Sequence, residues 1–125
     1  RNNLEIVNMD IEISGVLREG DECIILKVVD DCNLWPYVLI DNTYGPDGKV
    51  SNINRHLFIF PNKNVSEGDY IAIYTKVGTN TSFTNSQGST THKFFWGYDN
   101  DYRIWNKGGD RALLIKVSEY KNSNL

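Results

Sequence analysis

The sequence predicts a single all-β domain in which two sheets pack as a sandwich. No window shows the sustained i, i+3, i+4, i+7 apolar spacing, bounded by capping residues, that identifies an amphipathic helix. Short runs rich in Ile, Val, Tyr and Phe alternate with clusters of Asn, Asp, Gly and Ser, which is the pattern of strands joined by turns. Several short strands at such spacing are typical of a sandwich, and an OB-like barrel is the alternative architecture.

About eight strands are expected, each where a β-favouring run lies between turn signals. In chain order they are Leu4–Val7, Ile11–Val16, Cys23–Val29, Tyr37–Asp41, His56–Phe60, Tyr70–Thr75, Lys93–Trp96 and Ala112–Val117. Because side chains alternate across a strand, Ile24, Leu26 and Val28 share one face of the third strand. Ile71 and Ile73 share one face of the sixth strand for the same reason.

Glycines mark two of the turns. Gly68 can adopt positive φ and so begins the strand at Tyr70. Gly108-Gly109 allows a tight hairpin connection, since glycines tolerate the primed turns that match strand twist. Three longer loops and a frayed tail are also expected: Asn42–Asn54 with its Gly45-Pro46-Asp47-Gly48 turn, the polar and exposed Gly78–Thr91, the aromatic and acidic Tyr98–Asp110, and the tail Lys121–Leu125.

Length and composition indicate one ordinary globular domain. The chain has 125 residues, enough to bury a core without staples, and 40% of them are hydrophobic and 23% charged. The net charge of −3 disfavours nucleic-acid binding, which depends on Lys and Arg. No apolar run approaches the roughly 20 residues that span a bilayer. The chain shows no signal peptide and begins at Arg1, which fits a processed protein or a trimmed fragment.

The two cysteines, Cys23 and Cys32, do not form a disulfide framework or a zinc site. A hairpin turning near Asp30 and Asp31 would place Cys23 opposite a residue near Val38, not opposite Cys32. We therefore favour two free thiols, one on a strand and one in a loop.

Four segments together suggest a family. They are Glu22–Leu26, Asn33–Asp41, His56–Thr75 and Phe95–Leu114. The last is the most specific, with Trp96-Gly97 followed by Trp105-Asn106 and a Gly-Asp turn. In this order, the segments resemble the lamin-tail domain family of immunoglobulin-like β-sandwiches, over residues 4 to 118 of a single domain. Tyr37 stands where the family usually has Trp, and Pro36 where it has Gly, which leaves the detail of the first hairpin open.

The resemblance implies a binding role and no chemistry. The family has no catalytic residues to carry over, and in animals its members end nuclear intermediate-filament proteins and bind proteins, DNA or chromatin. In bacteria they occur as modules of exported or surface-associated proteins and are thought to tether or position. The short acidic chain and its Trp-Asn-x-x-Gly-Asp ending favour the bacterial type. An extracellular or cell-envelope location is therefore expected.

No catalytic constellation or metal motif is evident, so we predict no enzyme, no metal and no cofactor. His56 begins a strand and His92 ends a loop, and both are expected at the surface without a placed partner. No Gly-x-Ser-x-Gly elbow occurs. Two oxygen-rich stretches could bind Ca²⁺, but neither has EF-hand spacing, and turn capping is the simpler interpretation. They are Asp99, Asn100, Asp101 and Asp110, and Asp41, Asn42 and Asp47.

Aromatic residues offer a second route to binding. Six of them stand out: Trp35, Tyr37, Trp96, Tyr98, Tyr102 and Trp105. An exposed row could stack on sugar rings, whereas the simpler interpretation places Trp96 and Trp105 in the core with Phe58. Tyr98 and Tyr102, in a polar loop, are the two expected to be exposed.

The sequence therefore favours a non-catalytic interaction module that docks a protein or its own larger assembly. The predicted contact surfaces are the sheet edges and the loops Gly78–Thr91 and Tyr98–Asp110. The predicted binding residues are Tyr98, Asp99, Asp101, Tyr102 and Arg103. A carbohydrate-binding module using the same aromatics is the alternative. A nucleic-acid-binding domain, using a basic patch of Lys49, Arg55 and Lys63, is the third possibility.

Overall fold

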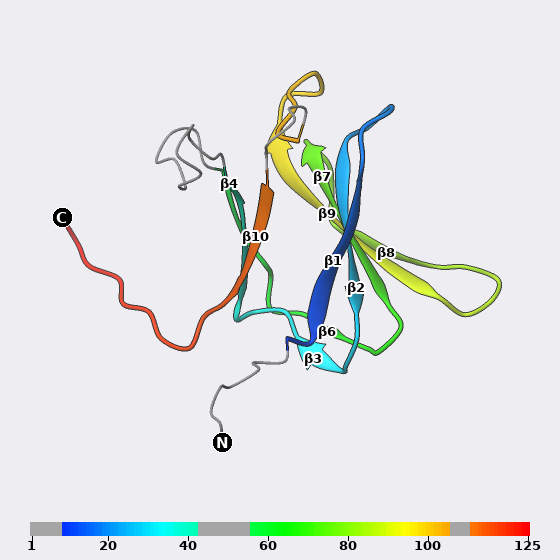
Figure 1. Cartoon of the computed structure of the whole chain (residues 1–125), viewed down its shortest axis with the longest axis horizontal. Coiled ribbons are helices and arrows are strands. Elements are labelled where there is room, and N and C mark those ends of the chain that lie inside the picture. The colour runs from blue at the N-terminus through cyan, green and yellow to red at the C-terminus, as the bar shows by residue number, and fades with distance from the viewer. Residues whose placement is uncertain (1–8, 43–55, 106–110) are drawn as a thin grey trace.

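The computed structural model describes residues 9–42, 56–105 and 111–125, and this part of the chain is all-β, without a helix (Figure 1). Ten strands form: β1 (Ile11–Leu17), β2 (Cys23–Val28), β3 (Cys32–Asn33), β4 (Tyr37–Asn42), β5 (Leu57–Ile59), β6 (Asn64–Val65), β7 (Tyr70–Lys76), β8 (Thr81–Thr84), β9 (Thr90–Tyr98) and β10 (Arg111–Lys116). The predicted strand Leu4–Val7 and the Gly108-Gly109 turn lie outside the described residues. The described residues contain no helix that could cross a membrane.

Two open sheets face each other. One has the strand order β1-β2-β7-β9-β8, with a parallel β7–β9 pair and otherwise antiparallel neighbours. The other has the order β10-β4-β5 and is antiparallel throughout. Figure 1 shows β4 and β10 on one side of the molecule and the larger sheet on the other. A third sheet has only the two short strands β3 and β6. The predicted sandwich is confirmed, since the ladders of the described residues leave the two larger sheets separate and do not close into the alternative OB-like barrel.

The hairpin that would place Cys23 opposite Val38 does not form. β2 pairs with β1 and β7, whereas β4 pairs with β10 and β5, so these consecutive long strands lie in different sheets. The short strand β3 lies where the chain passes from one sheet to the other. It is held there because Cys32 pairs with Val65 and Leu34 N donates to Lys63 O at 2.9 Å. Cys32 therefore lies on a two-residue strand, where a loop was expected.

The segment Gly78–Thr91, expected as a loop, forms a hairpin instead. It contains β8 and the start of β9, and Asn85 closes the turn by accepting hydrogen bonds from Gln87 N and Ser89 N. Gly88 adopts φ +85°, which suits glycine. All four residues of β8 are exposed, so this strand carries no apolar alternation. With no apolar alternation, the only feature of the sequence that favoured a strand here was its content of threonine, a β-branched residue.

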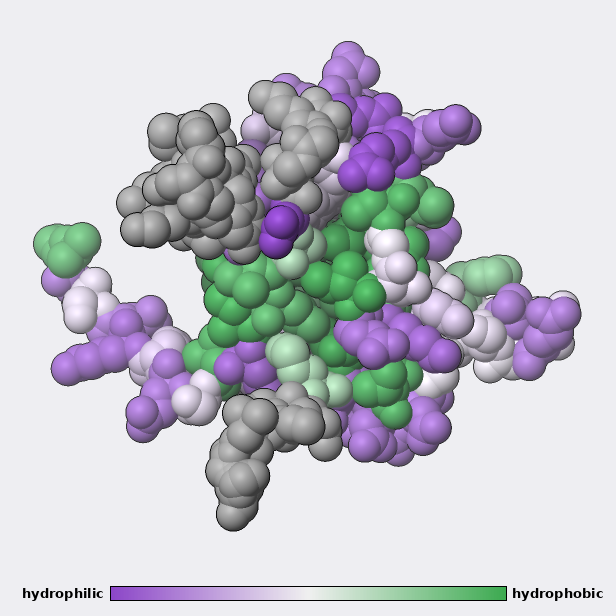
Figure 2. Space-filling model, viewed as in Figure 1, coloured by the Kyte–Doolittle hydropathy of each residue, from purple (hydrophilic) through white to green (hydrophobic). Residues whose placement is uncertain are grey.

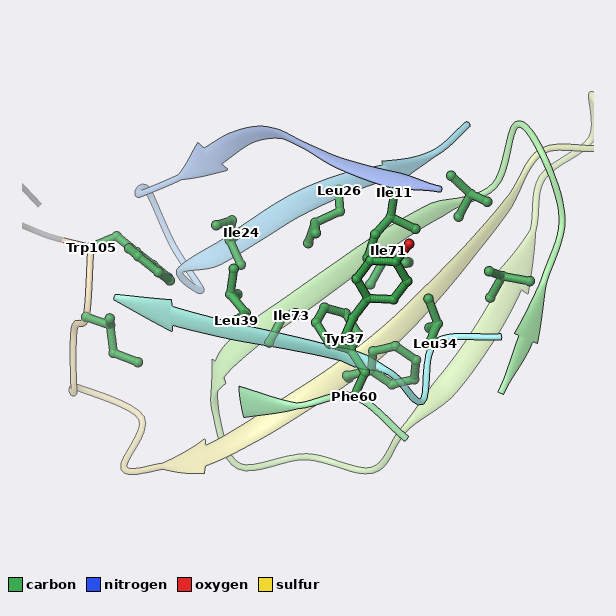
Figure 3. Packing of buried hydrophobic residues seen from close by; sticks show 14 residues of the cluster. Ile11, Ile24, Leu26, Leu34, Tyr37, Leu39, Phe60, Ile71, Ile73 and Trp105 are labelled. Carbon is green, nitrogen blue, oxygen red and sulfur yellow. The ribbon is translucent and has the colours of Figure 1, made fainter. Parts of the chain in front are cut away.

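The core lies between the two sheets, as the alternation predicted. Ile24, Leu26 and Val28 are buried on β2, and Ile71 and Ile73 are buried on β7. Figure 3 shows the side chains of Ile24, Leu26, Ile71 and Ile73 meeting those of the opposite sheet. That second set includes Tyr37, Leu39 and Phe60, with Trp105 closing one end. Phe58 and Trp96, expected inside, are only partly buried and pack against this cluster.

One buried carboxylate fixes the loop that follows β9. Glu22, at the start of β2, accepts hydrogen bonds from Thr75 Oγ1 (2.6 Å), Ile104 N (2.8 Å) and Trp105 N (3.1 Å). Arg18 Nε also donates to Trp105 O at 2.6 Å. The β1–β2 turn and the end of the loop are therefore held together, which positions the predicted binding residues.

Candidate functional site

The predicted binding loop brings its two tyrosines together. The rings of Tyr98 and Tyr102 stack with centroids 4.7 Å apart and planes 24° apart. A turn makes this possible, because Tyr102 N donates to Asp99 O at 2.9 Å. Tyr98 is half-buried at the end of β9, whereas Tyr102 is 41% exposed. Asp99 and Asp101 are exposed beside them.

Arg103, the fifth predicted residue, turns away from this group. Its guanidinium donates to Gly20 O at 2.8 Å and to Arg18 O at 3.5 Å, both in the β1–β2 turn. Arg103 therefore ties the loop to the neighbouring turn. A guanidinium engaged in this way has fewer donors left for a partner.

His56 and Asp41 join the tyrosines, and the sequence reasoning missed them as a pair. His56 Nδ1 lies 3.0 Å from Asp41 Oδ2, and His56 Nε2 lies 2.6 Å from the Tyr102 hydroxyl. The His56 backbone N–H also donates to Asp41 Oδ1. Since a carboxylate only accepts, Nδ1 is the donor in the contact with Asp41. Burial, followed by the nearby Tyr102 and Asp41, raises the pKa of Tyr98.

The surface placement expected for the histidines is therefore wrong. The side chain of His56 is 16% exposed and partnered at both ring nitrogens. His92 is buried, with Nε2 2.8 Å from Asp69 Oδ2 and Nδ1 2.8 Å from Ser82 Oγ. Ser82 and His92 are opposite each other on β8 and β9, and Asp69 precedes β7. This polar chain therefore links three neighbouring strands of the larger sheet.

The contacts of Ser82, His92 and Asp69 follow the order of a nucleophilic triad, but the ring nitrogens are exchanged relative to the familiar serine-protease arrangement. Asp69 Oδ2 also accepts from Ser66 N at 3.0 Å, which fixes the carboxylate. All of β8 is exposed, so Ser82 lies on an open edge strand. The hydrogen bonds account for the burial of His92, because a buried imidazole needs partners at both nitrogens.

An apolar surface lies outside the predicted loops, on the smaller of the two facing sheets. Six aliphatic side chains lie on the outward side of the β10-β4-β5 sheet, next to the pair Arg111 and Asn42, and we call these six the outer apolar face. They form two rows across the sheet, Leu113–Ile40–Leu57 and Ile115–Val38–Ile59. Residues directly opposite in a sheet point to the same side. Leu57, Ile59 and Leu113 are 52%, 55% and 43% exposed, and Figure 2 shows the hydrophobic surface over β4 and β10.

A groove of about 510 Å³ continues this face at one end. Its lining residues are Trp35, Pro36, Val38, Ile59, Val117, Ser118, Tyr120 and Asn122. Trp35 and Tyr120 meet edge to face with centroids 6.3 Å apart, and they are 48% and 68% exposed. Val38 and Ile59 belong to both the groove and the outer apolar face. The two features therefore form one continuous apolar surface.

The cysteines are both free. Burial raises the pKa of the Cys23 thiol, and burial followed by Asp10 raises that of Cys32 to about 11. No group of three or more His, Cys, Asp or Glu within residues 9–42, 56–105 and 111–125 is arranged to hold a metal. Of the residues considered for Ca²⁺ or for a basic patch, Asp47, Lys49, Arg55 and Asp110 lie outside those ranges.

Comparison with protein-family models, with curated proteins and with solved structures finds no match to this chain.

Proposed function

We propose that this chain is a non-catalytic interaction module that binds another protein chain through the outer apolar face. The observation that carries the proposal is the pair of aliphatic rows on the β10-β4-β5 sheet. Isolated exposed apolar residues are ordinary on soluble proteins, whereas a contiguous apolar patch indicates an interaction site. Burying an exposed Leu or Ile side chain contributes about 1.5–3 kcal/mol, so half-exposed members contribute about 1 kcal/mol each.

The lamin-tail resemblance belongs to this proposal. Three of the four segments that carry it meet at one point, where Glu22 accepts hydrogen bonds from Thr75 and from the backbone of Ile104 and Trp105. Residues far apart in the sequence thus donate to one buried carboxylate, and this shared contact is a physical reason for the three segments to occur together. We infer that the chain is a module of the bacterial type, tethering an exported or surface-associated protein.

Glycan binding through Tyr98 and Tyr102 is less well supported. Sugar rings stack on an exposed aromatic face, and a coplanar exposed pair would favour that function. Tyr98 and Tyr102 instead stack on each other, and the Tyr102 hydroxyl is engaged by His56. This loop is therefore better suited to the rim of a protein interface than to a sugar platform.

The test compares proteins cross-linked to the purified chain in extracts of its native source. Leu57→Lys places a charge in the outer apolar face, and Leu17→Lys is the matched control, because Leu17 is 57% exposed on β1 of the other sheet. We expect Leu57→Lys to lose specific partners and Leu17→Lys to retain them. The same partner profile for all three proteins would overturn the proposal.

A further inference from the structure

We propose that the partner of the outer apolar face is a second copy of this chain, which packs the same face against it in a two-fold dimer. This inference rests on the proposed function and names the partner. All six residues of the two rows are Val, Ile or Leu, so these rows carry no side-chain hydrogen-bonding group and no charge, and Arg111 and Asn42 form the next pair on the same side of the sheet, beyond Leu113 and Ile40. Two copies can oppose these rows without placing a charge or an unpaired polar side chain between them. Homodimer interfaces are more apolar than the rest of the protein surface.

The strand arrangement of the face allows it to pack against a copy of itself. It consists of three adjacent strands, so it forms a regular pleated surface that a second copy can meet as sheets do in a sandwich. A two-fold axis in the plane between the sheets brings each row of one copy against the rows of the other, about 10 Å apart. Because β4 is central and β10 and β5 flank it, the contact is widest along β4.

The available area meets the requirement of a weak dimer. The six aliphatic side chains, with the half-exposed Trp35 and Tyr120 at the adjoining groove, offer about 500 Å² per copy. A two-fold contact then buries about 1,000 Å² in total, which is the lower bound for a specific interface. We therefore expect reversible association at micromolar concentrations and not an obligate dimer.

The charged residues nearest the face stand at the two ends of β10. Lys116 points to the inward side by alternation, and its Nζ lies 3.7 Å from Asp10 Oδ2. Arg111 shares the outward side with Leu113 and Ile115 but lies at the end of the strand, opposite Asn42 and beyond the two aliphatic rows. The chain as a whole carries only −3, so long-range repulsion between copies is small and is screened further by salt. Self-association should therefore persist, and strengthen slightly, as the salt concentration rises.

Sedimentation velocity over a concentration series, from low micromolar to near-millimolar, tests the inference. We expect the wild-type mass to rise towards twice the 14.3 kDa chain, and Leu17→Lys to behave in the same way. Leu57→Lys and Leu113→Lys should each weaken association at least tenfold while retaining the wild-type circular dichroism spectrum. A wild-type protein that stays monomeric throughout would overturn the inference. So would equal dimerisation of all four proteins, which would indicate pairing at a sheet edge.

The cross-linking experiment separates the two proposals. If the wild-type chain is monomeric but Leu57→Lys still loses partners from the extract, the second copy is refuted and the interaction module stands. If Leu57→Lys also retains every partner, both proposals fail.

Discussion

Replacing Glu22 with glutamine should destabilise this domain more than any of the other substitutions proposed below. Glu22 Oε1 accepts from Thr75 Oγ1 and Ile104 N, and Oε2 accepts from Trp105 N. A glutamine retains one oxygen, and the position with two donors favours it. The new NH₂ then faces the Trp105 N–H, donor against donor, at a residue that is only 3% exposed.

The magnitude follows from these contacts. Losing a hydrogen bond to a charged group costs about 1.5–3 kcal/mol, and leaving a buried N–H unsatisfied is part of that cost. The two remaining bonds weaken because their acceptor becomes neutral. We expect Glu22→Gln to lower the free energy of unfolding by about 2–4 kcal/mol, a large share of the roughly 5–15 kcal/mol of a typical domain.

Urea denaturation followed by tryptophan fluorescence measures this loss, because Trp105 lies beside the substitution. Glu12→Gln is the control, since Glu12 is exposed on β1 and its replacement should change stability by less than about 0.5 kcal/mol. Thr75→Val removes one donor and keeps the shape, and should cost about 1 kcal/mol. A loss below about 1 kcal/mol for Glu22→Gln would refute the argument that this carboxylate holds the loop.

Three further predictions concern other sites. Gly78→Ala should lower the thermal midpoint, at a cost of about 1–2 kcal/mol, because the added Cβ overlaps the Phe95 ring. Tyr102→Phe removes the hydroxyl that forms a hydrogen bond with His56 Nε2. We expect it to lower the free energy of unfolding, measured by chemical denaturation, by at most about 1 kcal/mol, yet to speed hydrogen exchange of the loop amides. Equal exchange rates would count against that link. The pKa of Cys32 rises from 9.0 to about 11 on folding, so the unfolded thiol ionises first. The stability that the neutral Cys32 thiol contributes is present below pH 9 and is lost as the pH rises through 11. In urea titrations at several pH values, Cys32→Ser should not show this loss of unfolding free energy at high pH.

The strand pattern of the core was predictable because burial on one side imposes a visible period. Ile24, Leu26 and Val28 alternate with less buried neighbours, and the structure buries all three. Trp105 was predictable in the same sense, since a large aromatic residue beside an apolar strand usually closes a core. β8 escaped prediction because a strand exposed on both sides has no such period.

The candidate site was only partly predictable. Tyr98 and Tyr102 are close in sequence, so their meeting in one loop could be anticipated. Their partners His56 and Asp41 come from a different part of the chain, and nothing local to either residue indicates the other. Pairings of this kind depend on which strands become neighbours, which a single sequence does not reveal.

By itself, the sequence determined the fold class and the inward side of the core strands, because hydrophobic periodicity is a local property. Only the tertiary structure decided which apolar side chains remain exposed on the outward sides of the sheets. The run Tyr37-Val38-Leu39-Ile40 is apolar at every position, as in a strand buried on both sides, and the sequence cannot say whether both sides are covered. The fold covers Tyr37 and Leu39 and leaves Val38 and Ile40 on the outer apolar face. Burial depends on which elements pack against a strand, and that is settled by contacts between segments distant in the chain.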